Sequence, residues 1–494
     1  MNGPVRAKRE YTDESRCHRA NDGAHFVNAL FFGGFLAAMG SGIPIAIAMS
    51  IGSLLYIWLS GAIPPLAMVH RMVGGIDSFP LLAVPFFILA GNLMNSAGIT
   101  NRIYNFALAL VGWLKGGLGH VNVVGSVVFA GMSGTAVADA GGLGTIEIKA
   151  MKDHGYPVEF AVGITAASST LGPIIPPSLP MVIYGVQANT SIGKLFAAGF
   201  LPGIIMAIFM MIMVAWYAHV RNYGSDIPFS WLRMGRALTE LLAIIVVAVV
   251  LFYLWKNEEL SGLVKFGVPL LAVLALDKLM KFEAFMALLT PVILIGGMAS
   301  GLFTPTEAAV AAVAWALFLG FVWYRTLNFK MLMKISLDTV ETTATVMFIV
   351  ASASIFAWVL TTTQITEAIG VWVLSISSNP LVFLLLANLF LLFVGCFMET
   401  IAAITILVPV FMPIIKQLGI DPVHFGLIMV LNLMIGLLTP PVGMVLFILA
   451  KVSKLSFERT VVAVAPWIVP LLVTLAIITY MPNLVLWLPR LLYP

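Results

Sequence analysis

Two short stretches with paired prolines could expose backbone oxygens within an otherwise apolar chain. LGPIIPPS occupies residues 171–178, and IGLLTPPV occupies residues 435–442. Proline lacks a backbone N–H and clashes with the preceding helical turn, so a helix breaks there and nearby carbonyl groups lose their partners. Freed carbonyls and half-helix ends bind sodium in transporters whose helices are interrupted at mid-membrane. We therefore predict an ion or substrate site at each break, and a simple kink is the structural alternative.

The residues of each break are spaced so that they could act together. Residues three apart lie on about one helical turn, which points their carbonyl groups in similar directions. The candidate ion ligands of the two breaks are Gly172, Ile175, Ser178, Gly436, Thr439 and Val442. The candidate gating residues are the prolines themselves, Pro176, Pro177, Pro440 and Pro441.

Two further strings are predicted to form the tips of re-entrant hairpins, GMSGTAVADA at 131–140 and GCFMET at 395–400. Glycine permits a tight turn at such a tip, and hydroxyl groups add oxygen ligands for a hard cation. With the break in its own half of the chain, each tip could complete a sodium site. The structural alternative is a notch of small residues between packed helices. The candidate ligands at the tips are Ser133, Gly134, Thr135 and Thr400.

Acidic residues could act beside these sites. An intramembrane carboxylate such as Asp139 is a functional candidate by default, but it could equally cap the following helix. Glu399 is predicted to line the wall of a site or to be a structural acid, hydrogen-bonded or ion-paired. In the TPTE string, Thr304 and Glu307 flank Pro305. That pattern favours a helix N-cap over direct ion contact.

Lys and Arg are absent from the breaks and the tips. An anionic substrate would then be met by helix N-termini, hydroxyl groups and the charge of bound sodium. A neutral or zwitterionic substrate fits equally well, so the sequence does not identify the substrate.

The composition shows what kind of protein must position these residues. The chain has 494 residues, of which 61% are hydrophobic and 10% charged, whereas a soluble domain carries roughly 25% charged residues. This excludes a soluble enzyme, a nucleic-acid-binding protein and a disordered protein, and it predicts an all-α polytopic membrane protein. Cys17 and Cys396 do not imply a disulfide framework. Residues 1–25 form a polar tail without the apolar core of a signal peptide.

Apolar stretches long enough to cross about 30 Å of hydrocarbon predict about 12 transmembrane helices. The predicted crossings are 26–40, 43–60, 79–96, 158–188, 195–220, 239–256, 261–280, 284–300, 304–324, 340–362, 424–450 and 460–488. Two other apolar regions carry glycines, polar residues and a charge midway, and they are predicted to be the re-entrant hairpins. These are 120–154 and 380–416.

The chain repeats itself at a constant offset. Gly131 and Gly395 are 264 residues apart, as are Gly172 and Gly436, and the paired prolines follow the same offset. The matching order of motifs predicts an internal duplication. The predicted parts are a polar tail (1–25), a first inverted repeat (26–222), a linker with an inserted helical pair (223–283) and a second inverted repeat (284–494).

The positive charges predict that the repeats have opposite orientations and that both termini are periplasmic. With this topology 15 Lys and Arg residues fall on the cytoplasmic side, 6 on the other side and 5 in the tail. The split favours this orientation by the positive-inside rule, whereas the tail argues weakly against it, although its acidic residues nearly balance its charge. The 15 are Arg102, Lys115, Lys149, Lys152, Arg221, Arg233, Arg236, Lys278, Lys281, Arg325, Lys330, Lys334, Lys451, Lys454 and Arg459. The 6 are Arg71, Lys194, Lys256, Lys265, Lys416 and Arg490.

Six strings together resemble the large membrane subunit of TRAP transporters, the M-type (DctM-like) family, over roughly 26–222 and 284–494. They are FPLLAVPFFILAGNLM (79–94), SGTAVADAGGLGTI (133–146), GPIIPPSLPMVIYG (172–185), FTPTEAA (303–309), METIAAITILVPVFMP (398–413) and GLLTPPVG (436–443). The resemblance implies a sodium-coupled importer of organic acids in the bacterial inner membrane. It also implies an elevator, in which a scaffold holds a moving transport domain that carries the hairpins.

The resemblance further implies three kinds of partner besides the organic acid: a small four-helix membrane subunit, a periplasmic substrate-binding protein and membrane lipids. Nucleic acid is not expected, and sodium ions are coupling ions rather than a cofactor. The chain departs from the family pattern in the inserted pair at 239–281 and in its tail. The tail is too short to be a fused small subunit, so that partner should be a separate chain.

Two rival functions match parts of the sequence. A stand-alone elevator-type anion or dicarboxylate transporter, working without a binding protein, is the alternative. The string from Gly131 to Gly134 also matches the GxSG of rhomboid proteases, whose serine needs a histidine base. The intramembrane candidate for that base, His219, lies beside Arg221 without a frame of small residues. We therefore expect no enzyme activity.

Overall fold

The computed structural model describes residues 30–493 except 62–63, 65, 258–260, 262, 281, 283 and 377–378. The predicted polar tail, with Cys17, lies outside the described residues. In the described part the regular elements are helices, and the one β contact is an isolated bridge between Lys115 and Ser225. Seven described helices are long and apolar enough to cross a membrane, and shorter apolar helices such as Leu30–Gly40 accompany them. The prediction of an all-α polytopic membrane protein is confirmed.

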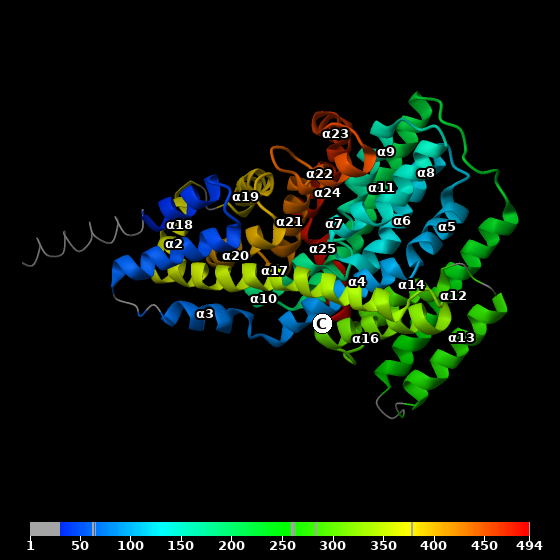
Figure 1. The fold of residues 1–494 in the computed structure, drawn as a ribbon, viewed down its shortest axis with the longest axis horizontal. Helices are drawn as coiled ribbons and strands as arrows, with labels where there is room; N and C mark the ends of the chain where they lie inside the picture. Colours follow the sequence, from blue (N-terminus) through cyan, green and yellow to red (C-terminus); the bar gives the residue numbers. More distant parts are fainter. Residues whose placement is uncertain are drawn as a thin grey trace, which may run out of the picture.

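A long helix, α17 (Phe329–Thr362), runs along most of the long axis of the molecule (Figure 1). Its 34 residues extend about 51 Å at 1.5 Å per residue, well beyond the ~30 Å hydrocarbon core. The predicted crossing began at 340, but the helix starts earlier because Asn328 caps it and accepts from the Met331 N–H at 2.8 Å. Its neighbours are α2 (Ile45–Ser60), α3 (Leu66–Ile76) and α4 (Ala83–Ser96), and α4 also packs against α16 (Pro305–Phe318).

A bundle of shorter helices fills the rest of the core. The first half supplies α6 (Gly117–Ser133), α7 (Ala136–Gly141), α8 (Leu143–Asp153), α9 (Val158–Ser169), α10 (Leu179–Gln187) and α11 (Ile192–Val220). The second half supplies α19 (Pro380–Gly395), α20 (Thr400–Gln417), α21 (Pro422–Gly436), α22 (Met444–Ser453), α23 (Phe457–Val464), η5 (Ala465–Trp467), α24 (Ile468–Tyr480) and α25 (Pro482–Leu492). The halves are joined along α11, which packs against α21, α24 and α25.

Two helices are interrupted where the prolines predicted it. The expected crossing 158–188 is two helices, α9 and α10, separated by irregular backbone from Thr170 to Ser178. Likewise α21 and α22 are separated by irregular backbone between Gly436 and Met444. Each interruption contains a cis peptide bond within its proline pair. The predicted breaks are confirmed as breaks of the helices.

The helices next to the breaks and tips pack across the two halves. The helix after the first tip, α7, contacts the helix after the second break, α22. The helix after the first break, α10, contacts the helix after the second tip, α20. In each contact, a helix that follows a hairpin tip packs against the helix that follows the break of the other half. Both tips and both breaks therefore lie within one bundle.

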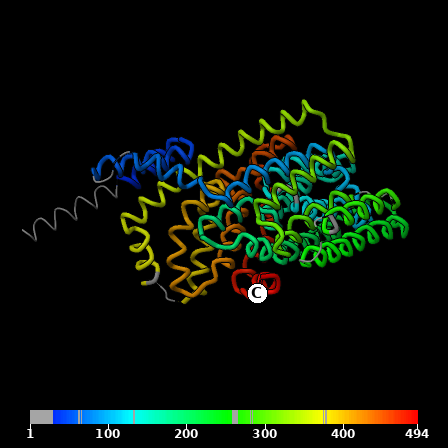
Figure 2. The backbone as a smooth tube through the Cα atoms, turned by 90° about the horizontal axis from the view of Figure 1, so that it is seen from below, coloured from blue at the N-terminus to red at the C-terminus, as the bar shows by residue number. Residues whose placement is uncertain are grey.

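The predicted insertion forms a helical pair at one end of the molecule, where its helices lie side by side in Figures 1 and 2. The pair consists of α12 (Trp231–Lys256), the short η2 (Leu263–Gly267) and α13 (Val268–Met280). Its first helix packs against α5 (Ile99–Val111), α14 (Phe285–Pro291) and η3 (Val292–Gly296). The remaining described elements are η1 (Phe79–Leu82), α15 (Gly297–Ala299), η4 (Leu319–Trp323) and α18 (Ile365–Ile376).

Candidate functional site

The first hairpin tip turns between α6 and α7 through a glycine. Gly134 has a φ of 63°, in the left-handed region that glycine adopts readily. Thr135 then caps α7, because its hydroxyl oxygen accepts from the Ala138 N–H at 3.2 Å. Ser133 ends α6, and its side chain lies outside the described residues.

This tip contacts the first break directly. The Leu179 N–H donates to the Gly134 carbonyl at 3.3 Å. A Cβ atom added at Gly172 would lie 3.3 Å from the Thr135 carbonyl oxygen, so the two backbones are neighbours. The fold therefore brings the predicted residues of the first tip together with those of the first break.

The first break presents main-chain oxygens in a buried segment. Residues 172–178 are all buried. Among the described residues, no hydrogen bond ends on the carbonyl oxygen of Gly172 or of Ile175. The Ser178 hydroxyl is engaged, since it accepts from the Met181 N–H at 3.2 Å and caps α10. Unpaired carbonyls in a broken intramembrane helix are suited to a hard cation such as sodium.

The second tip is built on a matching cap. One carboxylate oxygen of Glu399 accepts from the N–H groups of Ile401 (2.9 Å) and Ala402 (3.1 Å) at the start of α20. Glu399 is hydrogen-bonded, as predicted for a structural acid, and it also lines a cavity beside this tip, as predicted for a site wall. Glu399 is 264 residues after Thr135, so both tips use equivalent positions as caps. The next residue, Thr400, is 2% exposed, and its hydroxyl has no partner among the described residues.

The second tip also contacts its own break. The Val442 N–H donates to the Cys396 carbonyl at 3.2 Å. The Cys396 thiol lies 3.2 Å from the Thr439 hydroxyl, which donates to the Gly436 carbonyl at 2.9 Å. Cys396 belongs to the GCFMET string that the sequence predicts to form this tip, although it was not among the candidate ligands.

A cavity of about 290 Å³ opens beside the second tip. Its walls come from the tip (395–399), from the break and the start of α22 (437 and 442–444), and from the loop before α2 (39–45). Gly443 precedes α22 without a side-chain cap. An uncapped helix N-terminus on a cavity is a natural place for an anionic group. Among the predicted gating residues, Pro440 and Pro441 are exposed, whereas Pro176 and Pro177 are buried.

A buried polar cluster that the sequence analysis did not single out lies behind the first tip. The Asn122 amide donates to Glu147 and to Thr165, both at 2.7 Å, and its oxygen accepts from Ser168 at 2.6 Å. Asp139 is 1% exposed, and one of its carboxylate oxygens has no partner among the described residues. The capping role for Asp139 is wrong, because Thr135 caps α7 and α8 has no side-chain cap. The missed signal was the pair of polar residues, Asn122 and Glu147, in an apolar region.

The second half has a counterpart of this cluster without an acid. The Asn432 amide donates to Asn388 at 2.7 Å, and the Asn388 amide donates to Thr479 at 3.0 Å. Asn432 is 264 residues after Ser168. In both halves an asparagine on the first arm of the hairpin is therefore tied to the helix that precedes the break.

The TPTE string caps the start of α16. The Thr304 hydroxyl accepts from the Glu307 N–H at 3.3 Å, and Glu307 accepts from the Thr304 N–H at 2.7 Å. This reciprocal arrangement is a capping box at the start of α16. The predicted N-cap is confirmed for both residues, and no described contact joins them to either break.

The proposed protease pair is not formed. Ala218, beside His219 near the end of α11, packs against Gly116 at the start of α6. Ser133 lies at the opposite end of that helix, 17 residues away by its length, which is about 25 Å. His219 therefore cannot serve as a base for Ser133.

Comparison with known proteins agrees with this architecture. The profile of the family described as "Tripartite ATP-independent periplasmic transporter, DctM component" matches residues 32–484. The sialic acid TRAP transporter large permease protein SiaM of Vibrio cholerae is 43% identical over 458 residues, covering 93% of this chain and 97% of the relative. The C4-dicarboxylate TRAP transporter large permease protein DctM of Pseudomonas aeruginosa is 38% identical over 417 residues, covering 84% and 87%.

A solved structure supports the fold alone. The YdaH transporter of Alcanivorax borkumensis superposes with a TM-score of 0.54 at 14% sequence identity, covering 84% of this chain and 87% of that one. The match of the family profile over most of the chain, together with relatives of similar length, shows the family. The protein is a multi-pass inner-membrane protein that belongs to the DctM family, the large permease subunits of TRAP transporters.

Proposed function

We propose that this permease couples sodium entry to the import of an organic acid that a periplasmic binding protein delivers. The observation that carries this proposal is the pairing of each hairpin tip with the break in its own half. Leu179 joins the first break to Gly134, and Val442 joins the second break to Cys396. Two irregular segments with unpaired carbonyls in one bundle are what a sodium-coupled transporter needs.

In this proposal the first tip and break hold sodium through main-chain oxygens. Gly172 and Ile175 offer their carbonyls, and Gly134 and Thr135 close the site from the tip. At the second site Thr439 and Val442 offer carbonyls, since none of the described hydrogen bonds ends on either. Thr400 adds a buried hydroxyl.

The substrate is proposed to bind in the cavity beside the second tip. The uncapped start of α22 at Gly443 would face a carboxylate or another acidic group. The names of relatives with 34–43% identity mention sialic acid, 2,3-diketo-L-gulonate, C4-dicarboxylates and isethionate, which are all organic acids. This range of substrates supports an organic acid without selecting one of them.

Reconstitution tests the proposal. The permease and its small membrane subunit are placed in liposomes, with the binding protein and labelled substrate outside. We expect uptake only with an inward sodium gradient and the binding protein present. Uptake that persists when potassium replaces sodium would overturn the coupling. Uptake that persists without the binding protein would favour the stand-alone transporter. A variant with Gly33→Ala serves as a control, because a Cβ there meets nothing within 4 Å.

A further inference from the structure

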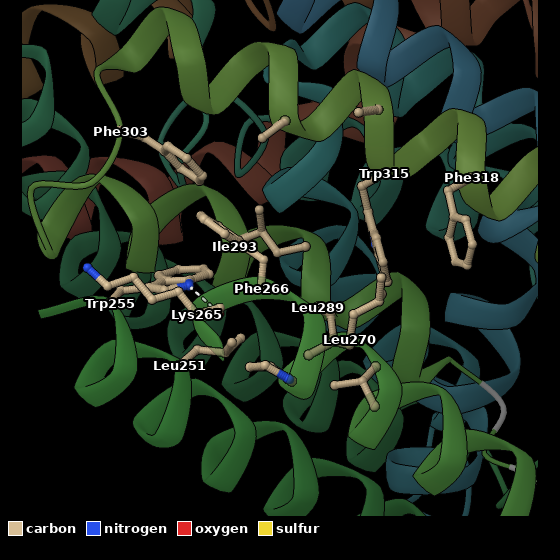
Figure 3. A pocket seen from close by; sticks show the side chains of 14 residues that line it. Leu251, Trp255, Lys265, Phe266, Leu270, Leu289, Ile293, Phe303, Trp315 and Phe318 are labelled. Atoms are coloured by element: carbon tan, nitrogen blue, oxygen red, sulfur yellow. Dashed lines mark hydrogen bonds between the residues drawn. The ribbon is translucent and has the colours of Figure 1, made fainter. Parts of the chain in front are cut away.

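A large apolar cavity separates the inserted helical pair from the helices it packs on. It has a volume of about 430 Å³ and lies between α12–α13 on one side and α14, η3 and α16 on the other. Figure 3 shows Leu251 and Leu270 of the pair facing a space that is closed on the opposite side by Trp315 and Phe318. The tips and breaks contribute none of its lining.

Aromatic side chains and hydrogen bonds join the inserted pair to the helices on the other side of the cavity. The Trp255 indole donates to the Lys265 carbonyl at 3.3 Å, and the Trp255 and Phe303 rings lie 6.0 Å apart. The Trp323 indole donates to Asp277 at 3.0 Å. The pair is therefore docked on its neighbours, and the hollow between them is a feature of the docked state.

Water and vacuum are both poor occupants of this space. An apolar cavity of about 150 Å³ already stays dry and takes up a benzene molecule, because water needs several polar partners. The Lys265 carbonyl already accepts a hydrogen bond from the Trp255 indole. An empty space of 430 Å³ would also deprive its lining of dispersion contacts.

The cavity can be reached from the surrounding hydrocarbon. Phe266 and Leu270, which line it, are 45% and 41% exposed. Inside a bilayer such exposed apolar groups meet acyl chains rather than water. An acyl chain is thus the apolar molecule that is always at hand to fill the space.

One basic side chain, that of Lys265, lines the cavity. Lys265 lies beside Trp255. Tryptophan and lysine are typical of the membrane interface, where lysine contacts lipid phosphate. Lys256 lies exposed nearby in the sequence but is not part of the lining.

We propose that this cavity is a binding site for one bilayer phospholipid, with an acyl chain between the inserted pair and α14–α16 and the phosphate at Lys265. The lipid completes the packing of the inserted pair. Since α12 and α13 alone leave the space unfilled, the pair and the lipid together form the outer wall of this end of the molecule.

Photolabelling tests the site. The permease with its small subunit is reconstituted in phosphatidylethanolamine and phosphatidylglycerol vesicles that contain a phosphatidylglycerol with a diazirine in its acyl chain. We expect labelled peptides from α14 to α16, around Leu289, Ile293 and Trp315. Labelling that is absent there would overturn the proposal. Labelling that appears only when the small subunit is left out would show that a protein helix fills the cavity.

Variants sharpen the assignment. Ala314→Phe fills the cavity from α16 and should reduce this labelling severalfold, whereas Ala275→Phe, on an exposed position outside the lining, should not. If Ala314→Phe does not yield folded protein, Ala311→Leu adds less volume at the same wall. Equal labelling in filled and control variants would contradict the site.

The headgroup contact has its own test. Lys265→Gln should weaken retention of phosphatidylglycerol in native mass spectra about fivefold, as expected for one lysine at a membrane surface. Lys256→Gln is the matched control and should have little effect. Equal losses of phosphatidylglycerol in the two variants would contradict the assignment of the phosphate to Lys265.

Discussion

The two tip–break pairs have the same plan but different surroundings. The first break is buried throughout residues 172–178, and an added Cβ at Gly172 would still have 3.3 Å to the Thr135 carbonyl oxygen. The second break has exposed prolines, borders a 290 Å³ cavity, and presses Gly436 onto the backbone of Gly395. Two similar motifs thus give one closed pair and one open pair, and only the open pair borders a cavity large enough for the proposed substrate besides its proposed ion site.

The tight contact of the second pair gives the largest expected effect. A Cβ at Gly436 would lie 2.6 Å from the Gly395 carbonyl oxygen. Because this neighbour is backbone, it cannot rotate away, and overpacking of this kind costs about 1–3 kcal/mol or more. We expect Gly436→Val to abolish uptake and to lower the melting temperature of the purified complex. An unchanged melting temperature with an altered sodium half-saturation of uptake would instead show that the backbone around Gly395 can move to accommodate the valine.

The polar clusters behind the two tip–break pairs should contribute different amounts to the stability of the protein. Asn122→Ala leaves the buried Glu147 without its amide partner and should destabilise the protein by about 3 kcal/mol. Asn388→Ala breaks bonds between neutral groups, and Asn432 keeps a bond to the Ile428 carbonyl at 2.8 Å. The stability lost on Asn388→Ala should be about 1 kcal/mol. Denaturant titration of both variants measures the difference, and equal losses would mean that the acid is not what distinguishes the two clusters.

The looser contact of the first pair allows a test of ion binding without collapse. Gly172→Ala brings a methyl group to 3.3 Å from the Thr135 carbonyl oxygen, so the tip must shift slightly. We expect the sodium half-saturation of uptake to rise about tenfold, which corresponds to 1.4 kcal/mol, while the melting temperature stays near that of Gly33→Ala. An unchanged half-saturation would leave the first break as a kink.

The smallest effect is expected at the cap of the second tip. Glu399→Ala removes the acceptor for the Ile401 and Ala402 N–H groups and should cost about 1 kcal/mol of stability. Glu399→Gln keeps an acceptor oxygen and should recover most of it. If the Gln variant is as unstable as the Ala variant, the negative charge rather than the hydrogen bonds supports this tip.

The sequence determined the local features of this protein. The apolar composition required a membrane helix bundle, because so few charges cannot cover a soluble surface. The paired prolines required the breaks, since proline removes a donor from the helical ladder. The TPTE string required its capping box for equally local reasons, as residues three apart meet on one helical turn.

The sequence predicted that each tip meets the break in its own half, but only the tertiary structure decided which atoms touch. The contacts of Gly134 with Leu179 and of Cys396 with Val442 join segments about 45 residues apart, and the local sequence does not specify such contacts. Packing also decided that the Asn122 amide donates to Glu147, which lies 25 residues further along the chain. The cavity between the inserted pair and α14–α16 depends on how three separate segments fit together. Side-chain shapes on all of them set that volume at once, which is why composition and spacing could not predict it.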